Sequence, residues 1–584
     1  MTISNPHRRH LLAGGVALGL APGWAQAATA GPGRELSGAD LKLVIDHGML
    51  RVGGRDGHAV TINGTVPGPL LRLKEGQKVR LAVENRLAED TSIHWHGLLV
   101  PSKYDGVPGL SFPGIRPGET FVYEFPLIQS GTYWYHSHSG LQEPMGHYAP
   151  LIIDPAGPDP IVSDREHVIM LSDFSFTHPH VLMTRLKQQP GYFNFQKQTL
   201  AGLLRGRDQT LAERREWAKM LMDPTDISDI TGSAFTYLLN GRAPGEPWSG
   251  LARTGERVRL RIINAAAQTI FNLRIPGLKL TVVAADGQAV RPIEVDELQI
   301  ANAETYDLIV QPTEDRAYAV VAEAVDRSGM ARAILAPRPG MAAEFPPLRE
   351  RPLGTMRDMG MDMSAMTMGG PRKAAPPPPP PGMAPVKPRG SDVMGDMGGM
   401  EMSMRDPLNA PSVKLTPGVQ SITPIVTDRT GEPGQGLESV GHRVLTYRDL
   451  VALAPNPDTR APTRTLEIHL TGNMERFMWG FDGLSYAEDP PPYPFREGER
   501  VRVTLVNDTM MAHPIHLHGH FFELVHGPDG HKPRKHTVTV QPGGKVVFDL
   551  TAEAVGDWAM HCHMLYHMHA GMFRVVTVRP EAKA

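Results

Sequence analysis

The stretch Gly-Gln-Lys-Val-Arg-Leu-Ala-Val-Glu-Asn, at residues 76–85, occurs in three related forms along the chain. It returns as Gly-Glu-Arg-Val-Arg-Leu-Arg-Ile-Ile-Asn at residues 255–264 and as Gly-Glu-Arg-Val-Arg-Val-Thr-Leu-Val-Asn at residues 498–507. In each copy apolar and polar residues alternate, which predicts a half-buried β-strand. Three copies in one register predict three related, strand-rich units.

Turn and strand signals flank every copy. A turn dipeptide lies upstream of each, at Asn63-Gly64, Asn240-Gly241 and Asp482-Gly483. A strand-like stretch lies downstream of each, at residues 120–125, 305–310 and 545–550. Many short strands with Gly and Pro turns favour β-sandwiches. We therefore expect an all-β protein with domains at residues 31–158, 159–339 and 416–584.

Composition narrows the class of protein. A length of 584 residues suggests three or four domains, and 41% apolar residues are enough for a sizeable core. A net charge of −3 does not favour nucleic acid or an anionic membrane as partner. Cys562 is the single cysteine, which excludes an intramolecular disulfide framework and a thiolate-rich zinc site. The 25 histidines and 29 methionines favour imidazole and thioether chemistry.

Residues 1–30 have the pattern of an export signal. Basic residues at 7–10 precede an apolar run at 11–21, and small residues at 25–27 or 28–30 offer a cleavage site. The adjacent Arg8 and Arg9 favour the twin-arginine route over ordinary secretion. The apolar run is too short to span a membrane, so we expect an exported protein without a membrane span.

Residues 340–415 break the strand pattern. They contain six consecutive prolines at 376–381 and many glycines, which predicts an extended, disordered linker. Twelve methionines fall between Met356 and Met404. Because thioethers are soft ligands that suit Cu(I), this segment is interpreted as a Cu(I) collector, with a merely biased linker as the alternative.

Histidines gather in four clusters. They are His94-Trp95-His96, His136-Ser137-His138, the set His513, His516 and His518, and His561-Cys562-His563 followed by His567 and Met572. Side chains two positions apart in a strand point to the same face. Each His-x-His pair can therefore present two imidazoles to one metal cluster, while Cys562 faces the other way. His513 has the opposite parity to His516 and can lie on the thiolate side.

The repeat register places these histidines in equivalent positions. His94 and His516 each lie nine residues after the asparagine of their repeat, whereas the middle repeat has Leu273 there. Likewise His136 and His561 each lie five residues after a glycine. Domains 1 and 3 are thus expected to share a cluster of eight imidazoles, and domain 2 to contribute no ligand.

Only the third domain can build a thiolate site. Two histidines and one cysteine with a weak methionine ligand is the blue-copper electron-transfer arrangement, and His513, His567, Cys562 and Met572 supply it. The alternatives are adventitious or zinc-binding histidine pairs. Zinc has no redox use for a thiolate wired to a second metal cluster.

Longer motifs resemble a known family. Residues 90–97 (Asp-Thr-Ser-Ile-His-Trp-His-Gly), 130–140 (Ser-Gly-Thr-Tyr-Trp-Tyr-His-Ser-His-Ser-Gly), 470–476 (Leu-Thr-Gly-Asn-Met-Glu-Arg) and 507–511 (Asn-Asp-Thr-Met-Met) resemble the multicopper oxidases. The likeness is greatest to the CopA-type copper-resistance oxidases of the bacterial periplasm. It implies cupredoxin-like Greek-key sandwiches and four copper ions.

The resemblance also implies a ligand for each copper. It assigns His94 and His516 to type 2 copper, His96, His136 and His563 to one type 3 copper, His138, His518 and His561 to the other, and Cys562, His513, His567 and Met572 to type 1 copper. Electrons from a donor would pass from Cys562 through His561 or His563 to the cluster that reduces O₂ to water.

Proton delivery is less clearly encoded. Asp105 resembles the family's carboxylate near type 2 copper and is a candidate proton relay, with a simple Asp-Gly turn as the alternative. Some related oxidases carry a glutamate just after the second type 1 histidine, where this chain has Met568.

Three functions fit these observations. The first is a periplasmic cuprous oxidase for copper tolerance that also oxidises phenols, and the second is a laccase-like phenol oxidase. The third is a copper-sequestering protein. A copper nitrite reductase would need no cluster of eight histidines. We expect a monomer that uses O₂ and a small donor, with other copper-handling proteins as further partners.

Overall fold

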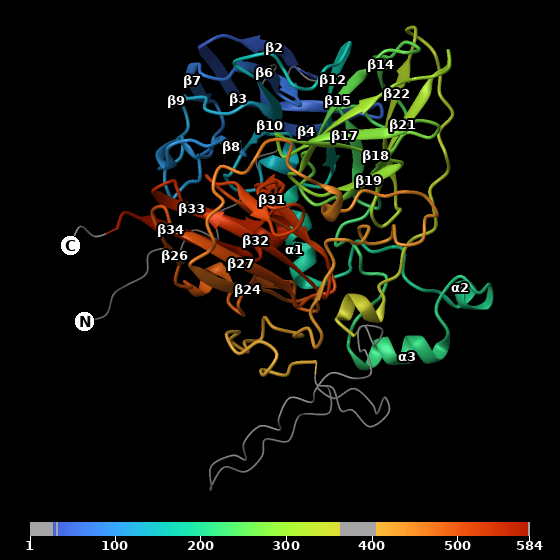
Figure 1. Cartoon of the computed structure of the whole chain (residues 1–584). Helices are drawn as coiled ribbons and strands as arrows, with labels where there is room; N and C mark the ends of the chain where they lie inside the picture. The colour runs from blue at the N-terminus through green and yellow to red at the C-terminus, as the bar shows by residue number, and fades with distance from the viewer. Residues whose placement is uncertain (1–26, 31–32, 362–403, 582–584) are drawn as a thin grey trace, which may run out of the picture.

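The computed structural model describes residues 27–30, 33–361 and 404–581. Strands dominate these residues and form six sheets, which pair into three sandwiches (Figure 1). The predicted all-β class is therefore confirmed. Most of the predicted export signal and the proline run of the linker lie outside the described residues.

Sandwich 1 is formed by β1 to β11. One sheet has the order β1-β5-β4-β3-β7-β9 and the other β2-β6-β11-β10-β8. The strands are β1 (Ala27–Ala30), β2 (Gly33–Ser37), β3 (Asp40–Val52), β4 (Arg55–Ile62), β5 (Thr65–Val66), β6 (Pro69–Lys74), β7 (Lys78–Asn85), β8 (His94–His96), β9 (Thr120–Pro126), β10 (Gly131–His136) and β11 (Tyr148–Asp154). Short 3-10 helices η2 (Ser102–Tyr104) and η3 (Glu143–Met145) lie in its loops.

Sandwich 2 is formed by β12 to β22. Its sheets have the orders β13-β12-β15-β20-β17-β18 and β14-β22-β21-β16-β19. The strands are β12 (Arg165–Phe174), β13 (Thr236–Leu239), β14 (Trp248–Leu251), β15 (Val258–Asn264), β16 (Phe271–Arg274), β17 (Leu280–Ala285), β18 (Gln288–Val295), β19 (Glu297–Ile300), β20 (Thr305–Val310), β21 (Tyr318–Ala324) and β22 (Met330–Ala336). Between β12 and β13 it carries α1 (Pro179–Gln188), α2 (Leu200–Leu204) and α3 (Leu211–Lys219), which the strand repeat did not predict.

Sandwich 3 is formed by β23 to β34. Its sheets have the orders β25-β24-β27-β32-β29-β30, with β23 beside β32, and β26-β34-β33-β28-β31. The strands are β23 (Thr427–Asp428), β24 (Arg464–Asn473), β25 (Met478–Phe481), β26 (Tyr493–Arg496), β27 (Arg500–Asn507), β28 (His513–Leu517), β29 (Phe522–Leu524), β30 (Arg534–Lys535), β31 (Thr537–Val540), β32 (Gly544–Thr551), β33 (Gly556–Cys562) and β34 (Phe573–Arg579). The helical elements here and before it are η4 (Met356–Met359), η6 (Tyr447–Asp449), η7 (Tyr486–Glu488) and α4 (Leu565–His569).

The repeated stretch occupies the same place in all three sandwiches. The strands β7, β15 and β27 each pair in parallel with a long strand and antiparallel with the strand predicted downstream. The three turn dipeptides also agree, because Asn63, Asn240 and Asp482 have φ of 51°, 51° and 53°. Asparagine and aspartate tolerate this left-handed conformation better than other side chains that carry a Cβ.

Burial of the repeat differs from the prediction in one copy. Burial alternates along β7, as expected, but every residue of β15 is buried. The reason is the contact with sandwich 1, since Arg261 Nη1 donates to Thr132 Oγ1 of β10 at 2.9 Å. Arg259 in the same strand binds Asp307 Oδ2 at 2.5 Å. Paired arginines, which sequence alternation marks as exposed, therefore lie inside a domain interface.

The two ends of the predicted linker are packed rather than extended. Met359, Met361 and Met404 are buried, and Ala410 and Val413 belong to a small apolar core. Moving thioether and methyl groups out of water lowers the free energy of the folded protein, which favours this packing. Residues 362–403 lie outside the described part of the chain.

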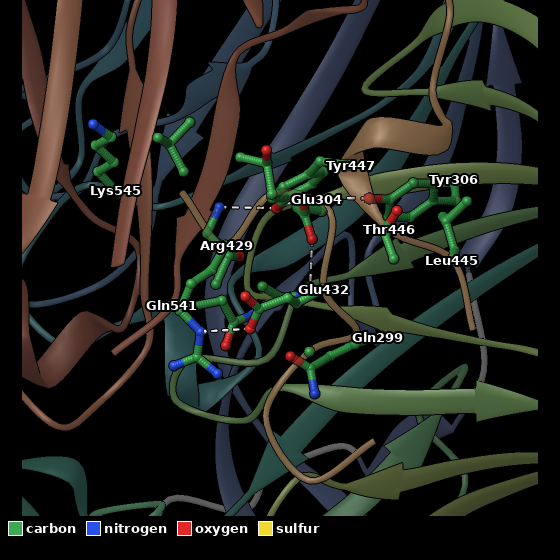
Figure 2. Close-up of a pocket in the computed structure, with 15 residues that line it drawn as sticks. Gln299, Glu304, Tyr306, Arg429, Glu432, Leu445, Thr446, Tyr447, Gln541 and Lys545 are labelled. Carbon is green, nitrogen blue, oxygen red and sulfur yellow. Dashed lines mark hydrogen bonds and ion pairs between the residues drawn. The ribbon is translucent and has the colours of Figure 1, made fainter. Parts of the chain in front are cut away.

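Sandwiches 2 and 3 are joined by a buried ionic network. Lys535 Nζ lies 3.1 Å from both Asp286 and Glu304 of sandwich 2. Tyr447 donates to Glu304 at 2.7 Å beside a cavity of about 40 Å³ (Figure 2). This network fixes the loop that follows Lys535 against sandwich 2.

In the described residues no helix is long and apolar enough to cross a membrane.

Candidate metal centre

Paired strands in sandwiches 1 and 3 present the predicted histidines. On β8 and β10, His94 lies directly opposite His136. On β28 and β33, His516 lies directly opposite His561. Residues on the same face of two opposed strands have side chains in contact. Both pairs of strands therefore direct imidazoles into the interface between sandwiches 1 and 3.

The sulfur site is assembled within sandwich 3. Cys562 Sγ lies 3.6 Å from His513 Nδ1 and 3.8 Å from His567 Nδ1, and the two nitrogens are 3.2 Å apart. All three side chains are completely buried. Met572 is buried as well, and its backbone carbonyl accepts a hydrogen bond from the Cys562 N–H at 3.1 Å. The structure thus brings together the residues predicted for the thiolate site.

Neighbouring groups orient the two imidazoles of the sulfur site. His567 Nε2 donates to Asp229 Oδ2 at 2.7 Å, and Asp229 comes from sandwich 2. His513 Nε2 lies 2.8 Å from Thr509 Oγ1. Both contacts leave Nδ1 facing the sulfur atom, and hydrogen bonds of this kind fix the ring tautomer of metal-binding histidines.

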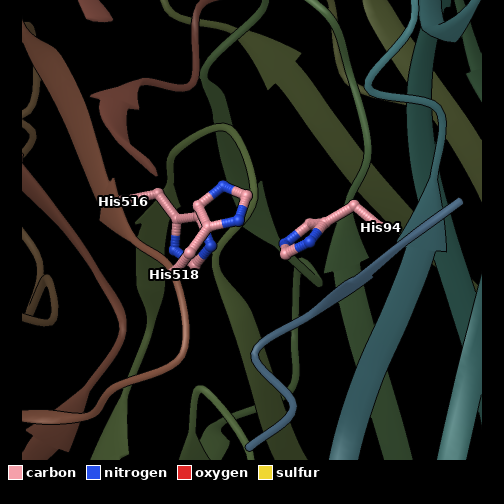
Figure 3. A group of neighbouring side chains, drawn as sticks. All are labelled: His94, His516 and His518. Atoms are coloured by element: carbon pink, nitrogen blue, oxygen red, sulfur yellow. The ribbon is translucent and has the colours of Figure 1, made fainter. Parts of the chain in front are cut away.

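The imidazole cluster lies beyond Cys562, between sandwiches 1 and 3. His561 Nε2 is 3.0 Å from His518 Nε2 and 3.3 Å from His138 Nε2. The rings of His94 and His518 approach to 3.9 Å between centroids (Figure 3). All eight predicted histidines line this one interface, and contacts of 4.8 Å or less join the ligand atoms of several triads.

Hydrogen bonding shows that these ring nitrogens carry lone pairs. His518 Nδ1 donates to Asp105 Oδ2 at 2.8 Å, and His561 Nδ1 donates to the Cys562 carbonyl at 3.0 Å. Because both partners can only accept, each Nε2 is unprotonated. Two lone pairs then face each other at 3.0 Å. A metal cation between them removes this repulsion.

Further ring nitrogens in the cluster have no hydrogen-bond partner among the residues that the structure describes. They are His94 Nε2, His96 Nδ1, His136 Nε2, His516 Nε2 and His563 Nε2, all buried. Buried polar atoms without hydrogen bonds are costly unless a ligand satisfies them. The donor set of imidazoles and one thiolate suits copper, so the residues present fit copper ions.

Burial keeps these side chains ready for metal. The pKa of His567 is lowered to about 3 and that of His561 to about 4, chiefly because burial disfavours the charged ring. In the absence of metal, burial also raises the pKa of the Cys562 thiol. Neutral imidazole is the form that binds metal, and metal binding displaces the thiol proton.

Asp105 follows η2 and is buried in the cluster. Its carboxylate accepts from His518, and its backbone carbonyl accepts from His94 Nδ1 at 2.7 Å. The side chain therefore contacts copper-ligand candidates instead of closing an Asp-Gly turn on its own backbone.

Three buried residues around the cluster were missed by the sequence analysis. Glu143 Oε2 lies 2.7 Å from His136 Nδ1, in the loop after the second histidine pair. The His536 carbonyl accepts from His516 Nδ1 at 2.8 Å, and the His536 ring lies 4.8 Å from that of His96. Asp229 is the third. Strand parity links none of them to the histidine pairs, because all three lie outside the strands.

Comparisons with known proteins agree with this geometry. Family models described as multicopper oxidase match residues 46–157, 165–340 and 459–582. Copper resistance protein A of Escherichia coli is 48% identical over 571 residues, covering 93% of each chain. Copper resistance protein A of Pseudomonas syringae pv. tomato is 47% identical and covers 97% of this chain and 96% of its own.

Solved structures share the fold at lower identity. The crystal structure of Fet3p, a multicopper oxidase that functions in iron import, superposes with a TM-score of 0.64 at 17% identity, covering 93% of this chain and 90% of its own. The laccase from Botrytis aclada gives a TM-score of 0.62 at 20% identity, covering 94% and 88%. The predicted cupredoxin-like architecture is confirmed.

Proposed function

Because the chain belongs to the multicopper oxidase family, and because methionines pack beside its sulfur site, we propose that it oxidises Cu(I) with O₂ as electron acceptor and serves copper tolerance. As a member of this family the protein is a copper-dependent oxidoreductase with four copper ions, acting on O₂. The choice of Cu(I) as donor is the proposal.

The observation that carries this choice is a methionine cluster in the described residues. Eight methionines pack around Trp217, namely Met220, Met222, Met356, Met359, Met361, Met404, Met474 and Met510. They come from the end of α3, from both ends of the methionine-rich segment and from two loops of sandwich 3. Thioether sulfur is a soft ligand that selects Cu(I) over harder divalent ions.

The methionine cluster adjoins the sulfur site. Met510 follows Thr509, whose hydroxyl contacts His513 at 2.8 Å. Met474 lies between β24 and β25, and Trp479 of β25 stacks on His567 at 4.0 Å. Met474 also packs against the core that contains Cys562. A Cu(I) ion held by these thioethers would lie close to the imidazoles that receive its electron.

The fold ties the parts of this donor site together. Gln420 donates to the Leu221 carbonyl at 3.3 Å and accepts from the Met474 N–H at 2.9 Å. Gly354 lies against Trp217 and Met510, and its N–H donates to the Pro224 carbonyl at 2.7 Å, which holds the segment that carries Met356 beside the cluster. His513 and His567 are both 0% exposed beneath this cover. That arrangement favours a small ion over a phenol as donor.

The mechanism follows from how the side chains hold their neighbours. Bound copper ions supply one-electron transfer from the donor and four-electron reduction of O₂ to water. Asp229 and Thr509 orient His567 and His513, and Cys562 joins the sulfur site covalently to His561 and His563. Asp105 orients His518 and His94 and is our candidate for moving protons to the O₂ site.

The ligand assignment implied by the family resemblance is retained as part of the proposal. His138, His518 and His561 form one compact triad, as expected for a type 3 copper. The other triads overlap, because His94 groups with His516 and His518 and also with His96 and His136. The division between the type 2 copper and the second type 3 copper therefore rests on the family motif.

The test compares Cu(I) with a phenol as sole donor. Met474→Leu/Met510→Leu keeps the volume and apolar character of the cluster but removes two thioethers. We expect O₂ uptake with Cu(I) to fall by at least about tenfold, while phenol oxidation is unchanged or faster. Met49→Leu/Met183→Leu, two methionines outside the methionine cluster, is the matched control.

Equal Cu(I) rates in the cluster variant and the control would contradict the proposal. Faster phenol turnover than Cu(I) turnover in the unmodified protein would favour the laccase-like alternative. Cu(I) uptake without O₂ consumption would favour sequestration. Substitution is preferable to deleting residues 356–404, because Met359, Met361 and Met404 are packed in the core of the cluster.

The cellular setting is part of the same proposal. The Arg8-Arg9 pair with the following apolar run supports export to the periplasm by the twin-arginine route. Copper tolerance is suggested by the relatives called copper resistance protein A. We expect a monomer, with other copper-handling proteins as donors of Cu(I).

A further inference from the structure

A second cavity, far from any predicted ligand in sequence, has a strongly basic lining. It has a volume of about 380 Å³ and lies between the loops around α2 and the chain at residues 349–353. Its basic residues are Lys197, Arg205, Arg207, Arg327, Arg349 and Arg351. Asp208 and Glu350 are the acidic residues in its lining. In Figure 1, α2 lies at the edge of the molecule.

The inner part of the lining is a buried arginine pair. Arg349 binds Glu323 and Glu297 through all of its guanidinium nitrogens, at 2.6 to 3.0 Å. Arg327, which is 4% exposed, lies 3.2 Å from the same Glu323. The pKa of Arg327 is lowered by burial and by repulsion from Arg349. Glu323 and Glu297 thus balance the charges of Arg349 and Arg327, and the basic residues that remain in the lining are Arg351, Lys197, Arg205 and Arg207.

One buried N–H group in the lining has no acceptor among the described residues. Arg351 Nη1 makes no hydrogen bond there, whereas Arg327 Nη1 lies 3.2 Å from Glu323 Oε2 and Arg327 Nη2 donates to the Gly436 carbonyl at 2.8 Å. The other terminal nitrogen of Arg351, Nη2, donates to Asp208 Oδ1 at 2.5 Å. This ion pair also neutralises the Asp208 carboxylate. A buried donor without an acceptor is costly, so an anion that accepts from Arg351 Nη1 would relieve the cost.

The outer part of the lining consists of exposed, unpaired cations. Lys197, Arg205 and Arg207 are exposed and make no ion pair with a described carboxylate. Surface arginines usually find a carboxylate or disperse, because like charges repel. Here two arginines and one lysine line the same cavity as Arg351. Guanidinium groups in such an array match tetrahedral oxyanions, which accept two hydrogen bonds from each fork.

From this arrangement we infer that the cavity is a binding site for a multivalent tetrahedral oxyanion, with phosphate or sulfate as the shared chemistry. Arg351 holds the anion from the buried side through Nη1. Arg205, Arg207 and Lys197 close over it from α2 and its flanking loops. The site uses no copper ligand and is independent of the proposed donor.

Titration calorimetry of the copper-loaded full chain tests the inference, with inorganic phosphate and then sulfate as probes at constant ionic strength. The test variant is Arg205→Glu/Arg207→Glu, because both side chains are exposed and reversal should leave folding intact. The control is Arg242→Glu/Arg291→Glu, which makes the same change in net charge at exposed arginines outside the cavity.

We expect saturable binding of one anion per chain, weakened at least about tenfold in the test variant and less than about twofold in the control. Tighter binding of phosphate than sulfate, or the reverse, shows which of the two anions the site prefers. Absence of saturable binding of either anion would overturn the inference, and so would equal affinity in both variants. Oxidase rates should be the same in all three proteins, so a failed donor proposal would leave this result unaffected.

Discussion

Sandwich 2 and sandwich 3 have the same sheet order but opposite chemistry. In sandwich 3, His516 on β28 lies opposite His561 on β33. At the equivalent place in sandwich 2, Leu273 on β16 lies opposite Ala322 on β21. Sandwich 1 has His94 and His136 at the same place. Leu273 and Ala322 are 0% exposed, and the four histidines are at most 2% exposed.

This difference shows that the fold does not need the histidines. An apolar pair closes the end of sandwich 2 through packing alone, whereas the imidazoles in the outer sandwiches face one another with unpaired nitrogens. The metal centre therefore adds chemistry to a fold that sandwich 2 builds without these histidines. Sandwich 2 still contributes through its loops, since Asp229 binds His567 at 2.7 Å.

The largest effect on O₂ uptake should come from removing an imidazole that sandwich 1 contributes to the shared cluster. His138→Ala removes a ring nitrogen 3.3 Å from His561 Nε2. We expect O₂ uptake to fall by more than about 100-fold, because loss of a direct ligand exceeds the usual effect of an outer partner. Donors should still bleach the blue absorption of the sulfur site in a single turnover. Loss of that absorption would mean that the two sites are not separate.

A smaller effect is expected from the carboxylate that sandwich 2 supplies. Asp229→Asn weakens the hydrogen bond that holds His567, so donor oxidation should fall about 10- to 100-fold and the reduction potential of the sulfur site should change. The nearby Asp226→Asn is the control, because Asp226 has no contact with His567 among the described residues. Identical potentials in both variants would assign Asp229 a purely structural role.

Adding a histidine to sandwich 2 should cost stability without creating a metal site. Leu273→His loses apolar burial and buries a polar ring, so the free energy of unfolding should fall by about 2–4 kcal/mol. Copper content and O₂ uptake should stay unchanged in the folded protein. Leu273→Met, a volume-conserving control, should cost less than about 1.5 kcal/mol. Extra bound copper in the histidine variant would show that the scaffold position alone suffices.

The smallest effect concerns acid stability of sandwich 2. Hydrogen bonds from Arg165 and the backbone lower the pKa of Glu256 from 4.5 to about 2. A lowered folded-state pKa gives stability that is present above pH 4.5 and is lost as pH falls toward about 2. Glu256→Gln should flatten this part of the pH dependence of the urea midpoint and leave neutral pH nearly unchanged. A larger loss at pH 7 than at pH 3 would contradict this sign.

Sequence periodicity predicted the strands of the scaffold and the candidate direct ligands, because both depend on local strand geometry. The alternation at residues 76–85 and its two copies located β7, β15 and β27, and the parity of His513 placed it beside Cys562. Glu143 follows the second histidine pair closely, but it lies in a 3-10 helix, to which strand parity does not apply. Periodicity could not find Asp229, because this carboxylate meets His567 only through the packing of a distant loop. Burial of Arg261 was missed for the same reason, since its partner Thr132 lies in another sandwich.

The methionine cluster was likewise predictable from the sequence only in part. Their number and chemistry were visible between Met356 and Met404, but Met220, Met474 and Met510 join the methionine cluster only after folding. Helices α1 to α3 were also missed, because the strand repeat carries no information about an insertion between two of its strands.

The central claim is that sandwich 3 holds a sulfur site distinct from an imidazole cluster shared with sandwich 1. Electron paramagnetic resonance of the copper-loaded protein and of Cys562→Ser tests it most directly. We predict that the variant loses the type 1 signal and the blue absorption while its type 2 signal remains, because His94 and His516 do not depend on the thiolate. Loss of both signals, or retention of both, would contradict the division into two sites.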